Sequence, residues 1–251
     1  MKKVISKEIN INCPTDFRSL IDDYSDISSI NQWDLGKYDA TSHRIDVKPG
    51  WQPIKLPNRR MPVHYKDALN EKIDAFMTKE LITPCHSPYS ASAMLVPKKN
   101  GKLRLVTDYW KLKEQLIKSC WPIPSIEEIS DTFQGSAYST TVDMSWGFYQ
   151  LPMEPKSQIY IAFSTPFGSF KWLGMPMGLT GSPNTFQSLM EHVLVGLTWN
   201  ITVPYLMTAS SFPKHQKSTI KYCNKFFKDF ARRIQKSIRQ NAPFSKRKFS
   251  Y

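Results

Sequence analysis

The sequence has no long apolar run: no stretch approaches the length of about 18 residues that a membrane-spanning helix requires. The N-terminal segment contains lysine but no apolar core behind it, so it does not resemble a secretory signal. The cysteines form neither a Cys-x-x-Cys pair nor a Cys/His pattern typical of a zinc site; they are Cys13, Cys85, Cys120 and Cys223. We therefore expect no transmembrane segment, reduced thiols, and an intracellular protein, either cytoplasmic or nuclear.

Acidic residues are scarce near the C-terminal end, where the positive charge is concentrated. The formal net charge is +13, and residues 214–251 contain twelve Lys or Arg against the single acid Asp229. The rest of the chain, with 22 basic and 20 acidic residues, is nearly neutral. Hydrophobic residues make up 41% of the chain, which argues against disorder. The composition predicts a neutral globular body with a basic tail, the kind of tail that binds polyanions without sequence preference.

Local patterns predict helices and strands in irregular order. Helical spacing of apolar residues predicts a helix over residues 65–81. Asn100-Gly101 lies between two extended runs, 92–98 and 103–109, and predicts a β-hairpin. The remaining predictions are a helix over 125–133 with a Ser125/Glu128 capping box, a helix from Ser182 (as cap) and Pro183 to Val195, and strands over 138–143, 149–153, 158–165, 169–173 and 201–205. This interleaving favours an α+β fold.

Four separated segments together carry a family resemblance: residues 95–109, 138–150, 163–170 and 175–187. In order and spacing, the region from about residue 43 to 205 resembles the reverse transcriptase of gypsy-type LTR retrotransposons. The resemblance implies right-hand polymerase fingers and a truncated palm. It also implies templated DNA synthesis, two Mg²⁺ ions, deoxynucleoside triphosphates, and an RNA or DNA primer–template as substrate.

The resemblance assigns phosphate-binding roles in the fingers hairpin. Lys98 or Lys99 and Arg104 match the family's triphosphate-binding cations, and ammonium and guanidinium groups both suit phosphate oxygens. Met177 and Gly178 match residues placed against the nucleotide. Without the other motifs, a solvated basic hairpin and a simple turn before a helix explain the same residues.

The resemblance also assigns a metal ligand. Asp143 matches the family's first metal-binding aspartate, and the Met144 carbonyl is a possible further ligand. Phe148 matches the aromatic residue that blocks a ribose 2′-hydroxyl, although most phenylalanines are simply core residues.

The sequence departs from the family where the second group of acids belongs. The family has Tyr-x-Asp-Asp after the last palm strand, whereas this chain reads Tyr205-Leu-Met-Thr208, and no Asp or Glu occurs from His192 to Lys228. Trp110 and Lys113 also replace the usual Arg and Asn. Because Asp143 alone cannot compensate the charge of two divalent cations, we expect this copy to be inactive.

These observations divide the chain into three predicted parts: a linker over 1–50, fingers and palm over 51–205, and a basic helical tail over 206–251. The tail resembles the segment before RNase H, which implies that the remaining palm and the thumb were excised between about residues 206 and 220. Two alternatives to an active enzyme stay open. One is a non-catalytic remnant that binds nucleic acid; the other is a basic amphipathic tail that binds a membrane or a protein partner.

Overall fold

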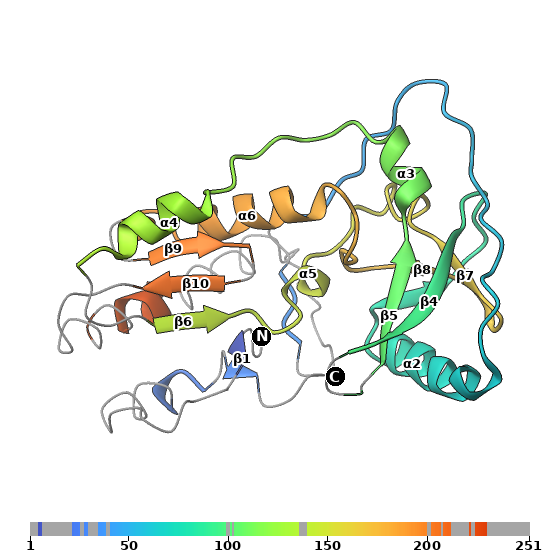
Figure 1. Ribbon diagram of the computed structural model, residues 1–251, viewed down its shortest axis with the longest axis horizontal. Coiled ribbons are helices and arrows are strands. Elements are labelled where there is room, and N and C mark those ends of the chain that lie inside the picture. The colour runs from blue at the N-terminus through green and yellow to red at the C-terminus, as the bar shows by residue number, and fades with distance from the viewer. Residues whose placement is uncertain are drawn as a thin grey trace, which may run out of the picture.

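Two β-sheets and the helices packed on them frame the described part of the computed structural model. It describes residues 5–6, 22–25, 28–29, 35–38, 41–98, 101, 103–135, 140–199, 202–206, 208–211, 221 and 224–229. Figure 1 shows a five-stranded sheet at one end, a three-stranded sheet at the other, and the short helix α5 between them. A further parallel pair joins β1 (Ile5–Ser6) to β2 (Ser28–Ser29). The mixture of helices and strands agrees with the predicted α+β class.

The five-stranded sheet has the order β3-β8-β7-β4-β5. Its strands are β3 (Ile82–Pro84), β4 (Ala91–Pro97), β5 (Leu103–Asp108), β7 (Phe163–Thr165) and β8 (Gly168–Trp172). The predicted hairpin is confirmed: β4 and β5 pair antiparallel, and Gly101 adopts a φ of 76° in their turn, a value that glycine tolerates without strain. Burial alternates along β5, whereas β4 is buried over its first three residues and becomes exposed at its end.

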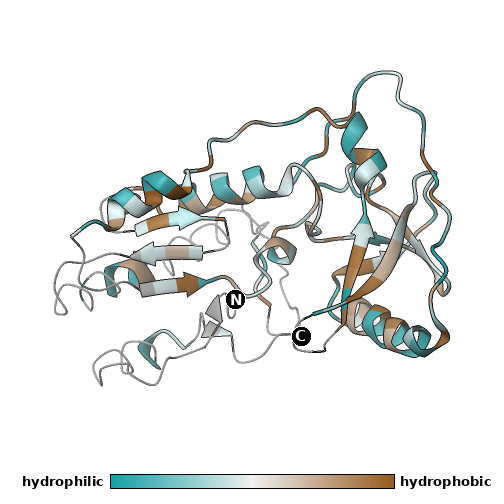
Figure 2. Ribbon diagram, viewed as in Figure 1, coloured by the Kyte–Doolittle hydropathy of each residue, from teal (hydrophilic) through white to brown (hydrophobic). Residues whose placement is uncertain are grey.

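Helix α2 (Lys66–Thr78) covers this sheet, preceded by a short 3₁₀ turn at Val63–Tyr65. Its buried residues Leu69, Ile73 and Phe76 follow the helical period that predicted it. Beneath it, the Trp172 ring lies 5.6 Å from Phe76 and 5.4 Å from Phe163, measured between ring centroids. Figure 2 shows apolar residues along β4 and β5 and a mixed pattern along α2, as expected for a helix with one buried face.

The three-stranded sheet has the order β6-β10-β9. Its strands are β6 (Thr140–Asp143), β9 (Thr202–Tyr205) and β10 (Thr208–Ser211), all antiparallel. Helix α6 (Ser182–Val193) packs along β9, and α4 (Ile126–Phe133) lies beside it in Figure 1. The sheet therefore continues past residue 205, and the predicted end of the palm falls in the turn between β9 and β10. The excision expected near residues 206–220 lies largely outside the described residues, but 208–211 form a strand.

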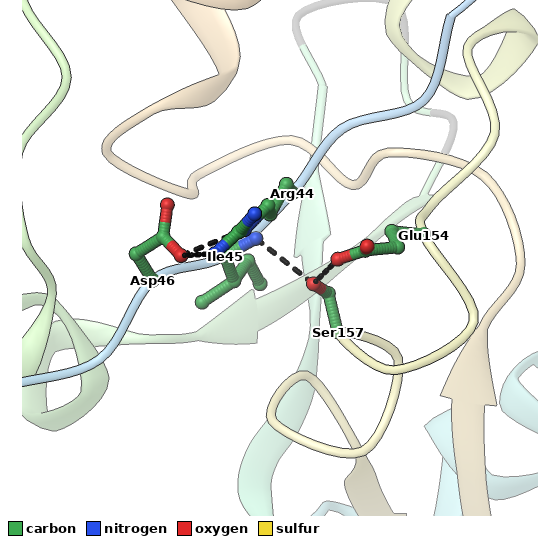
Figure 3. Close-up of polar contacts among 5 residues, drawn as sticks. All are labelled: Arg44, Ile45, Asp46, Glu154 and Ser157. Carbon is green, nitrogen blue, oxygen red and sulfur yellow. Dashed lines mark hydrogen bonds and ion pairs between the residues drawn. The ribbon is translucent and has the colours of Figure 1, made fainter.

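The segment over residues 43–48 is hydrogen-bonded to the body of the protein. His43 N–H donates to the Pro152 carbonyl at 2.8 Å, and Ile117 N–H donates to the Asp46 carbonyl at 2.9 Å. Figure 3 shows Ile45 N–H donating to Ser157 Oγ at 2.9 Å, and Ser157 in turn donating to Glu154 at 2.9 Å. Arg44 and Asp46 form an exposed ion pair at 2.7 Å on the same segment. Residues expected in a linker thus pack onto the body.

Several local predictions are wrong. Residues 149–153 do not form a strand, because α5 (Gly147–Gln150) begins after Trp146 in a left-handed conformation. The strand predicted over 158–165 is limited to β7. Ser182 does not cap α6: the N-cap is Gly181, and the Ser182 hydroxyl donates to the Pro176 carbonyl at 3.2 Å. The sequence patterns also gave no sign of α3 (Trp110–Gln115), β3 or β10.

Part of the basic tail is helical and packs onto the molecule. Residues 221 and 224–229 are helical, while the rest of 212–251 lies outside the described residues. Phe226 and Phe227 are buried, and the Phe227 ring stacks on Tyr24 at 5.5 Å between centroids. No helix in the described part of the chain combines the length and apolar character needed to span a membrane.

Candidate functional site

Asp143 ends β6 with an exposed side chain. Its register partner on the neighbouring strand is Thr208, and Thr208 is in turn paired with Tyr205 on β9. The Thr208 hydroxyl lies 3.4 Å from Asp143 Oδ1, at the long limit of a hydrogen bond. The turn to which the resemblance assigns the paired aspartates therefore lies beside Asp143. The side chain that faces Asp143 there is the hydroxyl of Thr208.

The turn between β9 and β10 is held by Gln187, a residue that sequence reasoning missed. Gln187 is fully buried on α6; its Nε2 donates to the Pro204 carbonyl at 3.0 Å, and its Oε1 accepts from Leu206 N–H at 2.9 Å. Leu206 has a φ of 51°, a left-handed conformation that costs free energy in a residue other than glycine. A glutamine on the buried face of a predicted amphipathic helix was the available signal, since a buried amide requires partners.

His43 fixes the start of the same helix. Its Nδ1 lies 2.9 Å from Thr185 Oγ1, and its ring packs against Gly181, where an added Cβ would lie 3.2 Å from His43 Cε1. Burial lowers the pKa of His43 from 6.5 to about 4, because the charged ring loses its hydration. His43 is therefore neutral at pH 7, and its tautomer decides which atom of the pair donates.

The predicted phosphate-binding cations lie on the β4–β5 hairpin. Lys98 follows β4 and is exposed, Arg104 on β5 is exposed opposite Val96, and Lys99 lies outside the described residues. Burial raises the pKa of Tyr149 to about 12, and the positive charge of Arg104 opposes this rise. Arg104 thus acts electrostatically on α5, the helix that follows Asp143.

The remaining predicted site residues lie around α5 and the segment before α6. Phe148 on α5 is half-buried and meets the Phe186 ring edge-on, with centroids 5.2 Å apart. Met144 is buried in the core, and Met177 packs against the core from its edge.

Two glycines near these residues are required for different reasons. Gly178 has a φ of 86°, so its backbone conformation, rather than lack of space, favours glycine there. At Gly147, an added Cβ would lie 2.8 Å from Phe186 Cζ, so glycine permits close packing of α5 on α6.

The donor set at Asp143 does not fit a pair of Mg²⁺ ions. Hard divalent cations require several oxygen ligands, mostly anionic, and the described side chains here offer one carboxylate and one hydroxyl. Within the described ranges, no group of three or more His, Cys, Asp or Glu side chains is placed to hold a metal ion. A cavity of about 430 Å³ lies elsewhere, between residues 119–121 and α6, and no predicted site residue lines it.

A family model for reverse transcriptase (RNA-dependent DNA polymerase) matches residues 96–237, more than half of the chain. The chain belongs to the reverse transcriptase family. The predicted resemblance is therefore confirmed. The match also includes residues 206–237, which the sequence patterns had placed in a separate tail.

Reverse transcriptase relatives come from retrotransposon polyproteins. The chain is 26% identical over 205 residues to the Retrovirus-related Pol polyprotein from transposon 412 of Drosophila melanogaster, covering 78% of this chain and 16% of the relative. It is 37% identical over 131 residues to that from transposon 297 of the same organism, covering 50% of this chain and 12% of the relative. The chain thus spans less than a fifth of the length of these relatives, and it is similar to the reverse transcriptase domain of a retrotransposon Pol polyprotein.

The fold also has a solved counterpart. The foamy viral protease–reverse transcriptase, in a complex with an RNA/DNA hybrid, aligns with a TM-score of 0.78 and 19% identity. The alignment covers 88% of this chain and 30% of the viral chain. At this identity the likeness establishes the fold alone: the two sheets and their helices are arranged as in a reverse transcriptase.

Proposed function

We propose that this reverse transcriptase domain is a degenerate copy that binds nucleic acid but does not polymerise DNA. The observation that carries the proposal is the residue beside Asp143. Thr208 is its register partner, and a hydroxyl faces the carboxylate at 3.4 Å where the family resemblance calls for an aspartate. Met207, the other position of the pair, lies outside the described residues, but its thioether is no ligand for a hard cation.

The size of the expected defect follows from electrostatics. The family resemblance calls for two Mg²⁺ ions, each of which requires oxygen ligands and charge compensation. Loss of one well-placed electrostatic group commonly lowers the rate about 10²-fold to 10³-fold, and here two carboxylates are absent together. One carboxylate and one hydroxyl supply no means to recover that stabilisation.

The remaining assignments follow the family pattern. We assign the five-stranded sheet with α2 to the fingers and the three-stranded sheet with α6 to the palm. Lys98 and Arg104 would meet the triphosphate of a deoxynucleotide, and Phe148 would border its sugar. An RNA or DNA primer–template would lie between the two sheets, an expectation supported by the hybrid bound to the foamy viral enzyme. We place residues 206–229 in the same domain, because β10 pairs with β6 and Phe226 is buried.

Primer extension tests the proposal directly. The purified chain is incubated with a primed RNA or DNA template and deoxynucleoside triphosphates, first with Mg²⁺ and then with Mn²⁺. We expect no extension with either ion. Processive synthesis that disappears in an Asp143→Asn variant would overturn the proposal, because it would show that this site holds catalytic metal.

Nucleic-acid binding without catalysis is the part of the proposal that the retained charges favour. Lys98 and Arg104 remain exposed on the hairpin although the acids are gone. Within the described part of the tail, the burial of Phe226 and Phe227 argues against membrane insertion of residues 224–229. Binding should weaken steeply with salt and show little sequence preference.

A further inference from the structure

The helical residues 224–229 are fixed to the body by their aromatic side chains. Phe226 and Phe227 are 4% and 5% exposed and belong to the hydrophobic core. Tyr24 stacks on Phe227 at 5.5 Å, and the Tyr24 hydroxyl donates to Asn224 Oδ1 at 3.1 Å. Two aromatic anchors and a polar contact leave this helix one orientation relative to the domain.

That orientation turns a row of lysines outward, here named the lysine stripe: Lys221, Lys225 and Lys228. They are spaced i, i+4 and i+7, which places them on one face of a helix, and all three are exposed. None forms an ion pair with another residue of the described ranges. Within residues 221–229 the only acid is the half-buried Asp229, so this segment itself carries a charge of +2, and the exposed acids Asp22 and Asp23 flank Tyr24 on the neighbouring segment.

We propose that the lysine stripe is a binding surface for the phosphate backbone of nucleic acid, separate from the primer–template site proposed between the two sheets. Along a helix with a rise of about 1.5 Å per residue, the stripe is about 10 Å long, which matches about three phosphates of one strand at about 3.4 Å per nucleotide. Lysine suits this role as a compact charge that contacts phosphates without reading bases.

The burial of the aromatic residues decides between nucleic acid and a membrane. An amphipathic helix that lies on a bilayer inserts its apolar face into the lipid. Here that face is occupied by Tyr24 and the core, so only the charged face is presented. A charged face without an apolar counterpart fits a polyanion in solution.

The salt dependence of binding measures how many phosphates the lysine stripe neutralises. Each neutralised phosphate contributes about 0.9 to the slope of log K against log salt for duplex DNA and about 0.7 for a single strand. If all three lysines contact phosphates, their removal should lower the slope by about 2 to 3. This number does not depend on whether the domain is catalytically active.

The experiment uses the full chain and three variants, two of which remove the same number of charges, with fluorescence anisotropy of a labelled RNA–DNA duplex over a series of salt concentrations. The test variant is Lys221→Gln/Lys225→Gln/Lys228→Gln. The control is Lys55→Gln/Lys79→Gln/Lys156→Gln, which removes the same charge from exposed positions elsewhere. The cleft variant is Lys98→Gln/Arg104→Gln. All substituted positions are exposed, so folding is expected to survive, and circular dichroism checks it.

We expect the stripe variant to lower the slope by about 2 to 3 and the control to change it by less than about 1. Equal slopes for the stripe variant and the wild type would overturn the proposal. This inference rests on the proposed nucleic-acid binding, and the cleft variant separates the two. If only the cleft variant weakens binding, the stripe fails and the proposed function stands. If the wild type does not bind, both fail. Binding to anionic vesicles that the stripe variant loses, without duplex binding, would assign the surface to membranes.

Discussion

The β4–β5 and β9–β10 hairpins differ in which of the residues predicted from the family they contain. The β4–β5 hairpin keeps both its backbone pairing and the exposed cations expected of a triphosphate-binding surface, Lys98 and Arg104. The β9–β10 hairpin keeps its pairing and its tight turn, but Thr208 stands where an acid is expected. The first hairpin carries the cations that the family resemblance predicts, and the second has the predicted strand without the predicted acids.

The backbone conformation of the β9–β10 hairpin does not depend on the side chains at positions 207 and 208. Gln187 on α6 holds the turn through Pro204 and Leu206, and neither contact involves residue 207 or 208. Loss of paired acids also removes like-charge repulsion, so nothing in the fold opposes their replacement. The pairing of β10 with β6 and β9 therefore persists with Thr208, rather than an acid, beside Asp143.

The largest expected effect comes from restoring the acids. Met207→Asp/Thr208→Asp should create Mn²⁺ binding, seen as a change in the Mn²⁺ electron paramagnetic resonance signal. Primer extension should rise by about 100-fold or more over the wild type, because each restored group stabilises charge at the metals. The triple variant that also carries Asp143→Asn serves as control and should lose both gains. Were the double variant to bind no metal, the conclusion that the hairpin retains its frame would be wrong.

A second, smaller effect should follow from breaking the frame instead. Gln187→Leu leaves the Pro204 carbonyl and the Leu206 N–H without their partner, at a cost of about 1 to 3 kcal/mol for each buried group. Urea unfolding should show a loss of about 2 to 6 kcal/mol. Gln52→Leu, at an exposed position, is the control and should change stability by less than about 0.5 kcal/mol. Unchanged amide exchange at Leu206 in the Gln187 variant would show that the turn does not need this contact.

The smallest of the three effects concerns pH and the anchor of α6. The pKa of His43 is lowered in the folded state from 6.5 to about 4, so the unfolded chain binds the proton more tightly. The contribution of the neutral His43 to stability is therefore present above pH 6.5, and it is lost as pH falls from 6.5 toward 4. Between pH 7 and pH 5 the loss should be about 2 kcal/mol.

His43→Gln should remove this part of the pH dependence while keeping a hydrogen-bonding group near Thr185. The matched control is His86→Gln. His86 is an exposed histidine that follows β3, and this variant should keep the wild-type dependence of stability on pH. Denaturant midpoints at pH 7, 6 and 5 give the comparison. A wild-type slope in the His43 variant would mean that another group titrates in this window.

Local sequence chemistry predicted elements whose stabilising contacts lie within a few residues. The capping box of α4 is present as expected: Glu128 N–H donates to Ser125 Oγ at 3.1 Å, and Ser125 N–H donates to Glu128 at 2.8 Å. Gly101 likewise lies in the turn that joins β4 to β5. Both features are closed by neighbouring residues, so no distant partner was needed to predict them.

Predictions failed where a distant neighbour supplied the partner. Tyr149, Leu151 and Met153 are all buried, but Tyr149 reaches the Trp172 ring from a helical turn rather than from the predicted strand. Ser182 finds a carbonyl at Pro176 and leaves the cap to Gly181. Strand β10 has no alternating apolar pattern and forms because β6 and β9 pair with it from both sides.

Four features could be read from the residues alone: the family, the position of Asp143 within its motif, the absence of acids near residues 205–208, and the concentration of positive charge toward the C-terminus. These are properties of residue identity and order, which no folding event alters. Only the tertiary structure decided that Thr208 is the partner of Asp143, that Gln187 holds the turn, and that the tail's aromatic face is buried so that its lysines point outward. Such facts depend on contacts between residues far apart in the chain, and these are fixed only when the core closes around them.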